Sequence, residues 1–205
     1  MRFNFIIMEK VAIYWGAFNP PTLAHAQVVE EVLKRQAASH VILSPSWERE
    51  DKDFWISASE RRKLVEIFFK ILRKQGLDVS LDTHFLEWKN TWITTTAWEE
   101  KYFREQLWVS PAFIFWSDVA PNMSWWSNNP DRFIEERLKK IFIKRPGFEF
   151  DFQANGFREY TLLDIPHMLD ISSSLAREIL KNKQSVEWIL LPEVAGKIQA
   201  QKLYQ

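Results

Sequence analysis

Short apolar runs alternate along this chain with longer segments of helical spacing, and this alternation is the strongest constraint on its fold. The expected strands are Val11 to Tyr14, Val41 to Leu43, Leu77 to Leu81, Ala112 to Phe115, Ile141 to Ile143 and Thr161 to Ile165. The expected helices are Thr22 to Lys34, Ser57 to Lys74, Thr94 to Leu107, Asp131 to Lys139, Ser172 to Lys181 and Pro192 to Leu203. Strands separated by helices of about ten or more residues form a parallel sheet with helices on both faces. We therefore predict an α/β protein with a doubly wound parallel sheet and a C-terminal helical subregion.

The size and charge of the chain set further bounds. With 205 residues, 46% of them hydrophobic, we expect one domain over residues 11–205 after an N-terminal extension, residues 1–10. The 27 basic and 27 acidic residues balance, so charge gives no reason to expect a nucleic acid or a membrane as partner. The chain has no cysteine, which suits the cytoplasm. The apolar part of residues 1–10 is far shorter than the roughly 18 residues of a membrane span, and Met8 is an alternative start.

The first expected strand and helix enclose a tight loop, Gly16 to Pro21. The first turn of the helix after this loop holds His25. A helix N-terminus leaves backbone N–H groups unpaired, and these groups bind anions such as phosphate. His25 adds a side-chain donor at the same place. The segment therefore predicts a phosphate site of the kind that nucleotides use.

A second cluster of polar residues begins the expected helix near residue 172. Asp170 or Ser172 can cap this helix, and Ser173 and Ser174 add hydroxyl groups. Arg177 follows within about one and a half turns, on a side chain long enough to reach a phosphate held at the helix start. The carboxyl ends of parallel strands lie at one edge of a sheet. We expect the loop near His25, and Asp118 after another strand, at that edge.

The loop sequence GAFNPPTLAH, residues 16–25, resembles the G-x-F-x-P-x-[HT]-x-G-H signature of the nucleotidyltransferase superfamily, and residues 171–177 resemble its I-S-S-T-x-x-R signature. The motifs between them follow the order of nicotinate/nicotinamide mononucleotide adenylyltransferases. These motifs are Ser44–Pro45 to Lys52, the helix start Ser57–Arg62, Glu87 with Thr94, Ser117–Asp118, Trp126, Lys144 to Gly147 and Asp164 to Pro166. The resemblance implies a Rossmann-like fold. It also implies adenylyl transfer from ATP to the 5′-phosphate of nicotinate or nicotinamide mononucleotide, with release of pyrophosphate, in NAD biosynthesis.

The same resemblance implies roles for individual residues. The catalytic residues would be His25, which donates to the α-phosphate, Thr22, whose hydroxyl contacts phosphate, and Arg177, which holds the β- and γ-phosphates. The ATP-binding residues would be Gly16, Ala17, Phe18, His25, Asp118, Ile171, Ser172, Ser173 and Arg177, with Asp118 accepting from a ribose hydroxyl. The mononucleotide-binding residues would be Asn19, Lys52, Thr94 and Trp126, with Trp126 stacking on the pyridine ring. Mg²⁺ would arrive on the ATP phosphates, so no protein metal ligands are expected.

Tryptophan stands at several positions where the family usually has glycine. Trp15 and Trp116 are such positions beside the expected nucleotide, and Ala24 is another departure. The chain has 11 Trp and only 5 Gly, although glycine is usually about 7% of residues. Two explanations stay open. In the first, many of these tryptophans are glycines in the biological protein, and a reassigned UGA codon was wrongly translated as tryptophan. In the second, the lineage is rich in tryptophan, and Trp15 and Trp116 crowd the ATP site.

Alternative functions stay open as well. The chain could transfer an adenylyl or cytidylyl group to another acceptor, such as phosphopantetheine, or be a nucleotide-binding protein that has lost turnover. The choice between nicotinate and nicotinamide and the existence of a homo-oligomer are also left open. We expect the isolated His40, His84 and His167 to be surface or structural residues. The basic run 61–63 and the carboxylate pairs Glu99–Glu100 and Glu135–Glu136 are expected on solvated helix faces.

Overall fold

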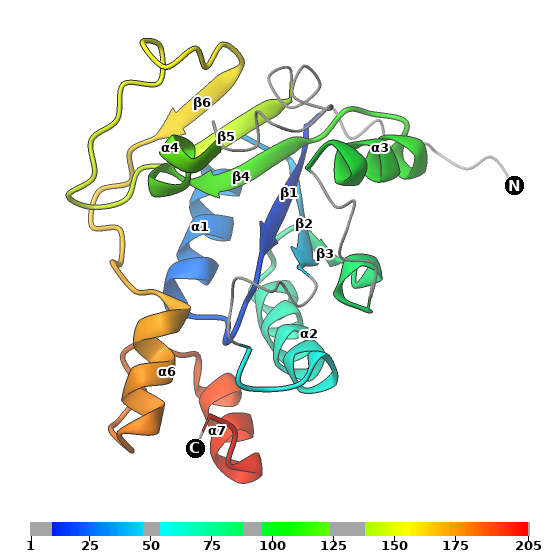
Figure 1. Ribbon diagram of the computed structural model, residues 1–205. Coiled ribbons are helices and arrows are strands. Elements are labelled where there is room, and N and C mark those ends of the chain that lie inside the picture. Colours follow the sequence, from blue (N-terminus) through cyan, green and yellow to red (C-terminus); the bar gives the residue numbers. More distant parts are fainter. Residues whose placement is uncertain (1–9, 47–53, 88–95, 124–137, 205) are drawn as a thin grey trace, which may run out of the picture.

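The computed structural model describes residues 10–46, 54–87, 96–123 and 138–204. Its strands form one parallel sheet of six strands in the order β3-β2-β1-β4-β5-β6 (Figure 1). They are β1 (Val11–Gly16), β2 (His40–Pro45), β3 (Val79–Leu81), β4 (Ala112–Trp116), β5 (Lys139–Ile143) and β6 (Tyr160–Leu163). The direction of winding reverses between β1 and β4, which is the strand order of a Rossmann-like fold. The predicted doubly wound parallel sheet is confirmed.

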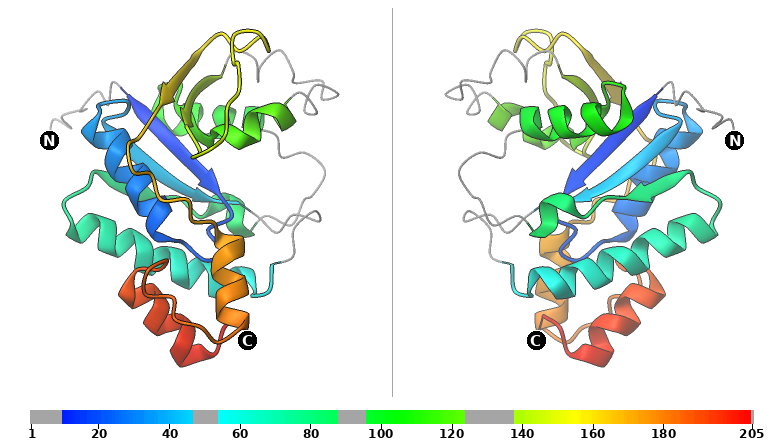
Figure 2. Two further views of the ribbon diagram at one scale, coloured as in Figure 1. Left: turned by 90° about the vertical axis from the view of Figure 1, so that its left-hand side faces the viewer. Right: turned by 90° about the vertical axis from the view of Figure 1, so that its right-hand side faces the viewer.

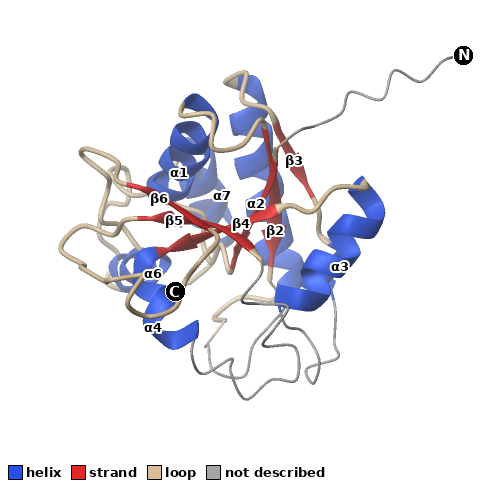
Figure 3. Cartoon of the chain, turned by 90° about the horizontal axis from the view of Figure 1, so that it is seen from above, coloured by secondary structure: helices blue, strands red, loops and turns tan. Residues whose placement is uncertain are grey.

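Helices cover both faces of this sheet (Figure 3). The helices of the described residues are α1 (Leu23–Lys34), α2 (Ala58–Lys74), η1 (His84–Glu87), α3 (Thr96–Leu107), η2 (Ser117–Val119), α4 (Ala120–Met123), α6 (Ser173–Lys181) and α7 (Pro192–Gln201). Alternate strand residues point to opposite faces. Ala12 and Tyr14 pack in one buried cluster with α1 and α2, whereas Ile13 and Phe113 pack in a second cluster with Phe103 of α3. Both faces of the central strands are therefore apolar, as buried parallel strands require.

Polar residues at the predicted positions begin three of the helices. Thr22 is the residue before α1. At α2 the Ser57 hydroxyl accepts from the Glu60 backbone N–H at 3.2 Å, and the Glu60 carboxylate accepts from the Ser57 N–H at 2.9 Å. At α6 the Ser172 hydroxyl accepts from the Leu175 N–H at 3.1 Å. Of the two residues expected as the cap of α6, it is therefore Ser172, and not Asp170, that caps the helix. Each such cap stabilises its helix by about 1 kcal/mol.

Several element boundaries differ from the expectation. The helix expected to run to Leu203 ends at Gln201, because Lys202 adopts a left-handed φ of 52°. Lys139, expected as the end of a helix, is the first residue of β5 and pairs with Ala112. The other residues of that expected helix before Leu138 lie outside the described part of the chain.

The helices α6 and α7 form a subregion beyond the carboxyl end of β1, beside α2 (Figure 2). The Leu23 N–H at the start of α1 donates to the Ile189 carbonyl at 2.8 Å and ties this subregion to the first loop. None of the helices in the described ranges is long and apolar enough to cross a membrane.

Candidate active site

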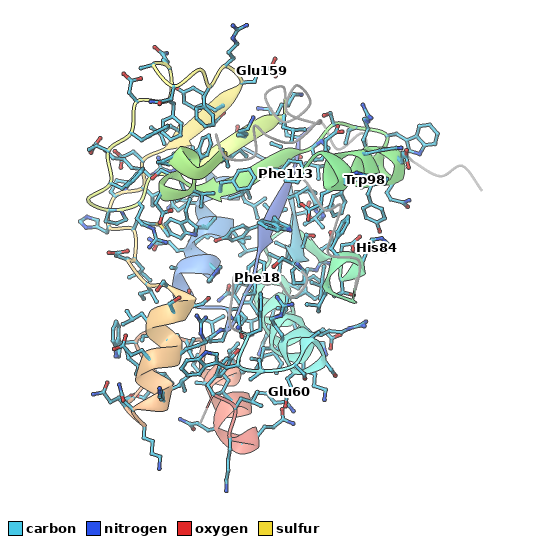
Figure 4. All side chains as sticks on the ribbon, in the orientation of Figure 1. Phe18, Glu60, His84, Trp98, Phe113 and Glu159 are labelled. Atoms are coloured by element: carbon cyan, nitrogen blue, oxygen red, sulfur yellow. The ribbon has the colours of Figure 1, made fainter. Side chains whose placement is uncertain are left out.

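The loop between β1 and α1 folds around a buried phenylalanine. Phe18 is fully buried where β1 ends (Figure 4). Its ring contacts the rings of Tyr14, His25 and Phe68, with centroids 5.3, 5.0 and 6.2 Å away. Phe18 has a left-handed φ of 45°, which is unusual for a bulky residue. The ring packing offsets this cost and fixes the course of the loop.

Side chains from distant helices hold three carbonyl groups of the loop. Arg61 Nη1 of α2 donates to the Ala17 oxygen at 3.0 Å. From α6, Arg177 Nη1 donates to the Asn19 oxygen at 2.8 Å and Ser173 Oγ donates to the Pro20 oxygen at 2.8 Å. The structure therefore brings together the two segments that the sequence singled out, although they lie about 150 residues apart. Because protein donors pair with these carbonyl oxygens, the oxygens repel a bound anion less, and this favours an anion at the loop.

His25 is held as a neutral ring with one defined donor. Its Nδ1 accepts from the Thr22 backbone N–H at 3.1 Å and lies 2.7 Å from the Thr22 hydroxyl. Burial lowers the pKa of His25 from 6.5 to about 4, and the positive charge of Arg145 lowers it further in the same direction. Because Nδ1 accepts, the ring proton resides on Nε2. Nε2 can therefore donate to a ligand at neutral pH.

Asp118 follows β4 at the switch point and carries an unused acceptor. Its Oδ2 lies 2.9 Å from Arg145 Nε. Its Oδ1 is buried and has no hydrogen-bond partner among the residues that the structure describes. An unpaired buried oxygen is costly unless a ligand satisfies it. This geometry suits the predicted role of Asp118 as the acceptor of a ribose hydroxyl.

Arg145 is a site residue to which sequence reasoning gave no role. It follows β5, and its Nη1 lies 3.2 Å from Asp170 Oδ1. Its guanidinium lies over the Trp116 ring, 4.6 Å from the centroid. Arg145 thus links the residues after β4 to the segment before α6. Arg145 lies in the run Lys144 to Gly147, directly after a strand. This position is the signal in the sequence that could have indicated a site residue.

The two tryptophans expected beside the nucleotide lie at the ends of neighbouring strands, Trp15 in β1 and Trp116 in β4. Burial raises the pKa of the Glu99 carboxyl well above its usual range, although the neighbouring Trp15 side chain acts in the opposite direction. The expectation of a solvated face was wrong for Glu99 and Glu100, which are 2% and 5% exposed. It was also wrong for Arg61, which is fully buried.

The other predicted site residues divide into two groups. Lys52, Thr94 and Trp126, expected at the mononucleotide, lie outside the described residues, as do Glu135 and Glu136. Gly16 is the last residue of β1, directly before Ala17 of the loop, and a Cβ on Gly16 would lie 3.4 Å from the Phe18 ring. Ile171 is buried in the core next to Ser172. Most of the residues expected at ATP therefore lie at or beside this loop. Of the residues expected at the mononucleotide, only Asn19 lies within the described part of the chain.

The remaining histidines are placed as structural or surface residues. His40 is buried and its two ring nitrogens lie 2.9 Å from Asp78 Oδ1 and 2.8 Å from Ser80 Oγ. His84 is exposed and stacks on Tyr102. Among the described residues, no three His, Asp or Glu side chains cluster as metal ligands would.

A parallel sheet with a switch point, a helix N-terminus that carries His25 at that point and a buried, unpaired carboxylate oxygen of Asp118 beside it are features of a nucleotide-binding α/β protein. The model of the family described as "Cytidylyltransferase-like" matches residues 13–179. The chain belongs to this family.

Comparison with individual proteins agrees with this assignment. The chain is 25% identical over 203 residues to a "Probable nicotinate-nucleotide adenylyltransferase" of Bacillus licheniformis, covering 97% of this chain and 100% of the relative. It is 23% identical over 206 residues to the nicotinate-nucleotide adenylyltransferase of Bacillus subtilis, with 97% and 100% covered. A structure of Plasmodium falciparum nicotinic acid mononucleotide adenylyltransferase complexed with NaAD superposes with a TM-score of 0.79 at 22% identity, covering 95% of this chain and 97% of that one. This last likeness shows a shared fold.

Proposed function

We propose that this protein transfers the adenylyl group of ATP to the 5′-phosphate of nicotinate mononucleotide and thereby acts in NAD biosynthesis. The observation that carries the proposal is the convergence of Ser173 and Arg177 on the loop that precedes His25. Two segments at the switch point of the sheet would thereby form one phosphate site. The choice of nicotinate follows the names of full-length relatives.

The proposed reaction requires little covalent work from the protein. A phosphate oxygen of the mononucleotide attacks the α-phosphorus of ATP and forms the new P–O bond. The bond from the α-phosphorus to its bridging oxygen breaks, and pyrophosphate leaves. Catalysis of this step is mostly positioning and stabilisation of charge on the phosphoryl oxygens. The neutral His25 ring suits this task, because Nε2–H can donate to the α-phosphate as charge develops there.

The other residues hold the substrates. Arg177, with Ser172 and Ser173, would bind the β- and γ-phosphates, and the planar guanidinium suits paired phosphate oxygens. Arg177 Nε is buried and has no partner among the described residues, so it is an unused donor. Asp118 Oδ1 would accept from a ribose hydroxyl, and Thr22 would contact phosphate.

The proposed contacts to the mononucleotide come from the sequence motifs. Asn19, Lys52, Thr94 and Trp126 remain the proposed mononucleotide contacts. We propose that Mg²⁺ enters with ATP and neutralises the polyphosphate through phosphate oxygens and water. The N–H groups and guanidinium groups of the described site would serve as additional donors to the phosphates.

The test is pyrophosphate release with defined pairs of substrates. ATP is combined in turn with nicotinate mononucleotide, nicotinamide mononucleotide and phosphopantetheine, and CTP replaces ATP in a parallel series. We expect release with ATP and nicotinate mononucleotide and formation of the dinucleotide. Release only with phosphopantetheine, or only with CTP, would contradict the proposal.

One observation favours a second candidate, a protein that binds nucleotide without turnover. Trp15 and Trp116 lie at the carboxyl ends of the two strands that flank the switch point. Saturable ATP binding with no pyrophosphate release would support this candidate. Recovery of release in Trp15→Gly/Trp116→Gly would show that the two side chains are the obstacle.

A further inference from the structure

Tyr204, which follows α7, reaches back to the loop near the start of the chain. Lys202 and Tyr204 have left-handed φ values of 52° and 64°. This turn directs Leu203 and Tyr204 into the protein, where they are 6% and 4% exposed. Two left-handed residues within three positions are costly for side chains other than glycine. The burial of this short segment must offset that cost.

The Tyr204 hydroxyl donates to Asn19 Oδ1 at 2.6 Å, across 185 positions of sequence. Asn19 is itself 2% exposed, and its backbone carbonyl accepts from Arg177. Asn19 is therefore held at two points, one on its backbone and one on its side chain. The Tyr204 hydroxyl engages only the oxygen of this amide, so the Nδ2 group is the part that can donate to a ligand.

The surroundings keep the Tyr204 phenol protonated. Burial raises its pKa, whereas the positive charges of Arg177 and Arg61 lower it and the Glu60 carboxylate raises it; the balance is upward. Glu60 lies at the start of α2, near α7 (Figure 4). A protonated phenol that donates selects the oxygen of the amide as its partner. The direction of the Asn19 Nδ2 group is thereby fixed.

We propose that Tyr204 is a positioning residue that orients the Asn19 side-chain amide toward the acceptor mononucleotide. This inference rests on the proposed function, in which Asn19 contacts that substrate. It assigns to the segment after α7 a part in setting mononucleotide affinity. The competing explanation is that Tyr204 only anchors the end of α7.

Steady-state kinetics of Tyr204→Phe separate the two explanations, because this change removes the hydroxyl and keeps the buried ring. We expect the KM for nicotinate mononucleotide to rise about three- to tenfold, the effect of one neutral hydrogen bond, with the KM for ATP within about twofold. Tyr102→Phe is the matched control, since it removes the Tyr102 hydrogen bond to Asp82 at 3.0 Å. Its KM values should equal those of the wild type. Unchanged KM values in Tyr204→Phe, or equal rises for both substrates, would overturn the inference.

A double-mutant cycle tests whether the effect passes through Asn19. Tyr204→Phe should add nothing to the KM of Asn19→Ala, because the amide that it orients is already gone. Full additivity of the two changes would contradict the proposed coupling.

NMR spectroscopy of the wild-type protein provides a further test. It requires no variant and no catalytic turnover. The Asn19 side-chain amide of the ¹⁵N-labelled protein should give two distinct N–H signals that shift when nicotinate mononucleotide is added. Binding of the mononucleotide without a shift of these signals would overturn the role of Asn19 and with it that of Tyr204. Absence of pyrophosphate release by the wild type would instead count against the proposed function.

Discussion

The Nδ1 atom of His25 accepts a hydrogen bond from the backbone N–H of Thr22 at 3.1 Å, so the first turn of α1 fixes the tautomer of its own histidine. The Thr22 hydroxyl lies 2.7 Å from the same nitrogen. The ring proton is thus placed on Nε2, the atom that remains for a ligand. Thr22 therefore both begins α1 and orients the proposed catalytic donor, the Nε2–H group of His25.

Loss of this donor should reduce turnover strongly. We expect His25→Ala to lower kcat about 10²- to 10³-fold, the usual effect of removing one donor to a charge that develops in the transition state. Pyrophosphate release at saturating ATP measures it. His84→Ala removes an exposed histidine and should retain the wild-type kcat. A change of less than threefold in His25→Ala would show that Nε2 does not act on the reacting phosphate.

The burial of His25 predicts a pH dependence of stability. Its folded pKa of about 4 lies below the ordinary histidine pKa of 6.5, so the unfolded chain binds more protons between these values and stability rises with pH there. The contribution is fully present above about pH 6.5 and is lost as the pH falls toward 4, by about 3 kcal/mol at most. Urea unfolding across this range should show a steeper acid loss for the wild type than for His25→Gln. Parallel curves would mean that the ring is not held neutral.

The buried Arg61 should be important for stability although its neighbour is not. Arg61→Met leaves the Ala17 carbonyl without its donor and should lower the free energy of unfolding by about 2–3 kcal/mol. Arg62→Ala is the matched control, because Arg62 is 41% exposed and pairs with the exposed Glu66, an interaction worth only about 0.5 kcal/mol. Chemical denaturation of both variants measures the difference. Equal effects would show that Arg61 does not hold the loop.

Trp108 tests the hypothesis that some tryptophans stand in place of glycines. It follows the last residue of α3 with a left-handed φ of 60° and is 86% exposed, the conformation that favours glycine after a helix. Trp108→Gly should therefore stabilise the protein by about 1 kcal/mol, which raises Tm by about 2–4 °C.

Trp188→Gly provides the control for this prediction. Trp188 is also exposed, at 57%, but it is not among the residues with a left-handed backbone. Its replacement by glycine should not raise Tm. A loss of stability in Trp108→Gly would count against the glycine hypothesis at this position, and sequencing of the codons for Trp15 and Trp116 would settle it for the site.

The sheet and the two loop segments could be predicted because their signals are local. Buried parallel strands appear as continuous apolar runs, and the helix starts at Thr22, Ser57 and Ser172 carry capping residues. The end of α7 could not be placed, since Lys202 has no side-chain property that predicts a left-handed φ. The extent of the helix expected near residues 131–139 was misjudged at Lys139, where pairing with β4 decides the conformation.

The residues that support the site gave no local signal. Arg61 lies in a basic run whose neighbour Arg62 is partly exposed, so the pattern resembles a solvated face, yet its partner Ala17 is 44 positions away. Glu99 is buried near Trp15, which belongs to a distant part of the chain, and the buried Tyr204 hydrogen-bonds Asn19 across 185 positions. Contacts across such distances follow from the assembled fold and cannot be derived from spacing along the chain.

The dependence of the β1–α1 loop on α2, α6 and Tyr204 has a consequence for how the protein matures. A nascent chain that stops short of α6 contains the whole loop sequence but lacks Ser173, Arg177 and Tyr204, which hold its carbonyl and amide groups. Such an intermediate should retain little ability to capture a triphosphate. We therefore expect the chain to gain affinity for nucleotide only after α6 and α7 have been synthesised and have packed against the loop. Nucleotide binding would then indicate that these helices are in place.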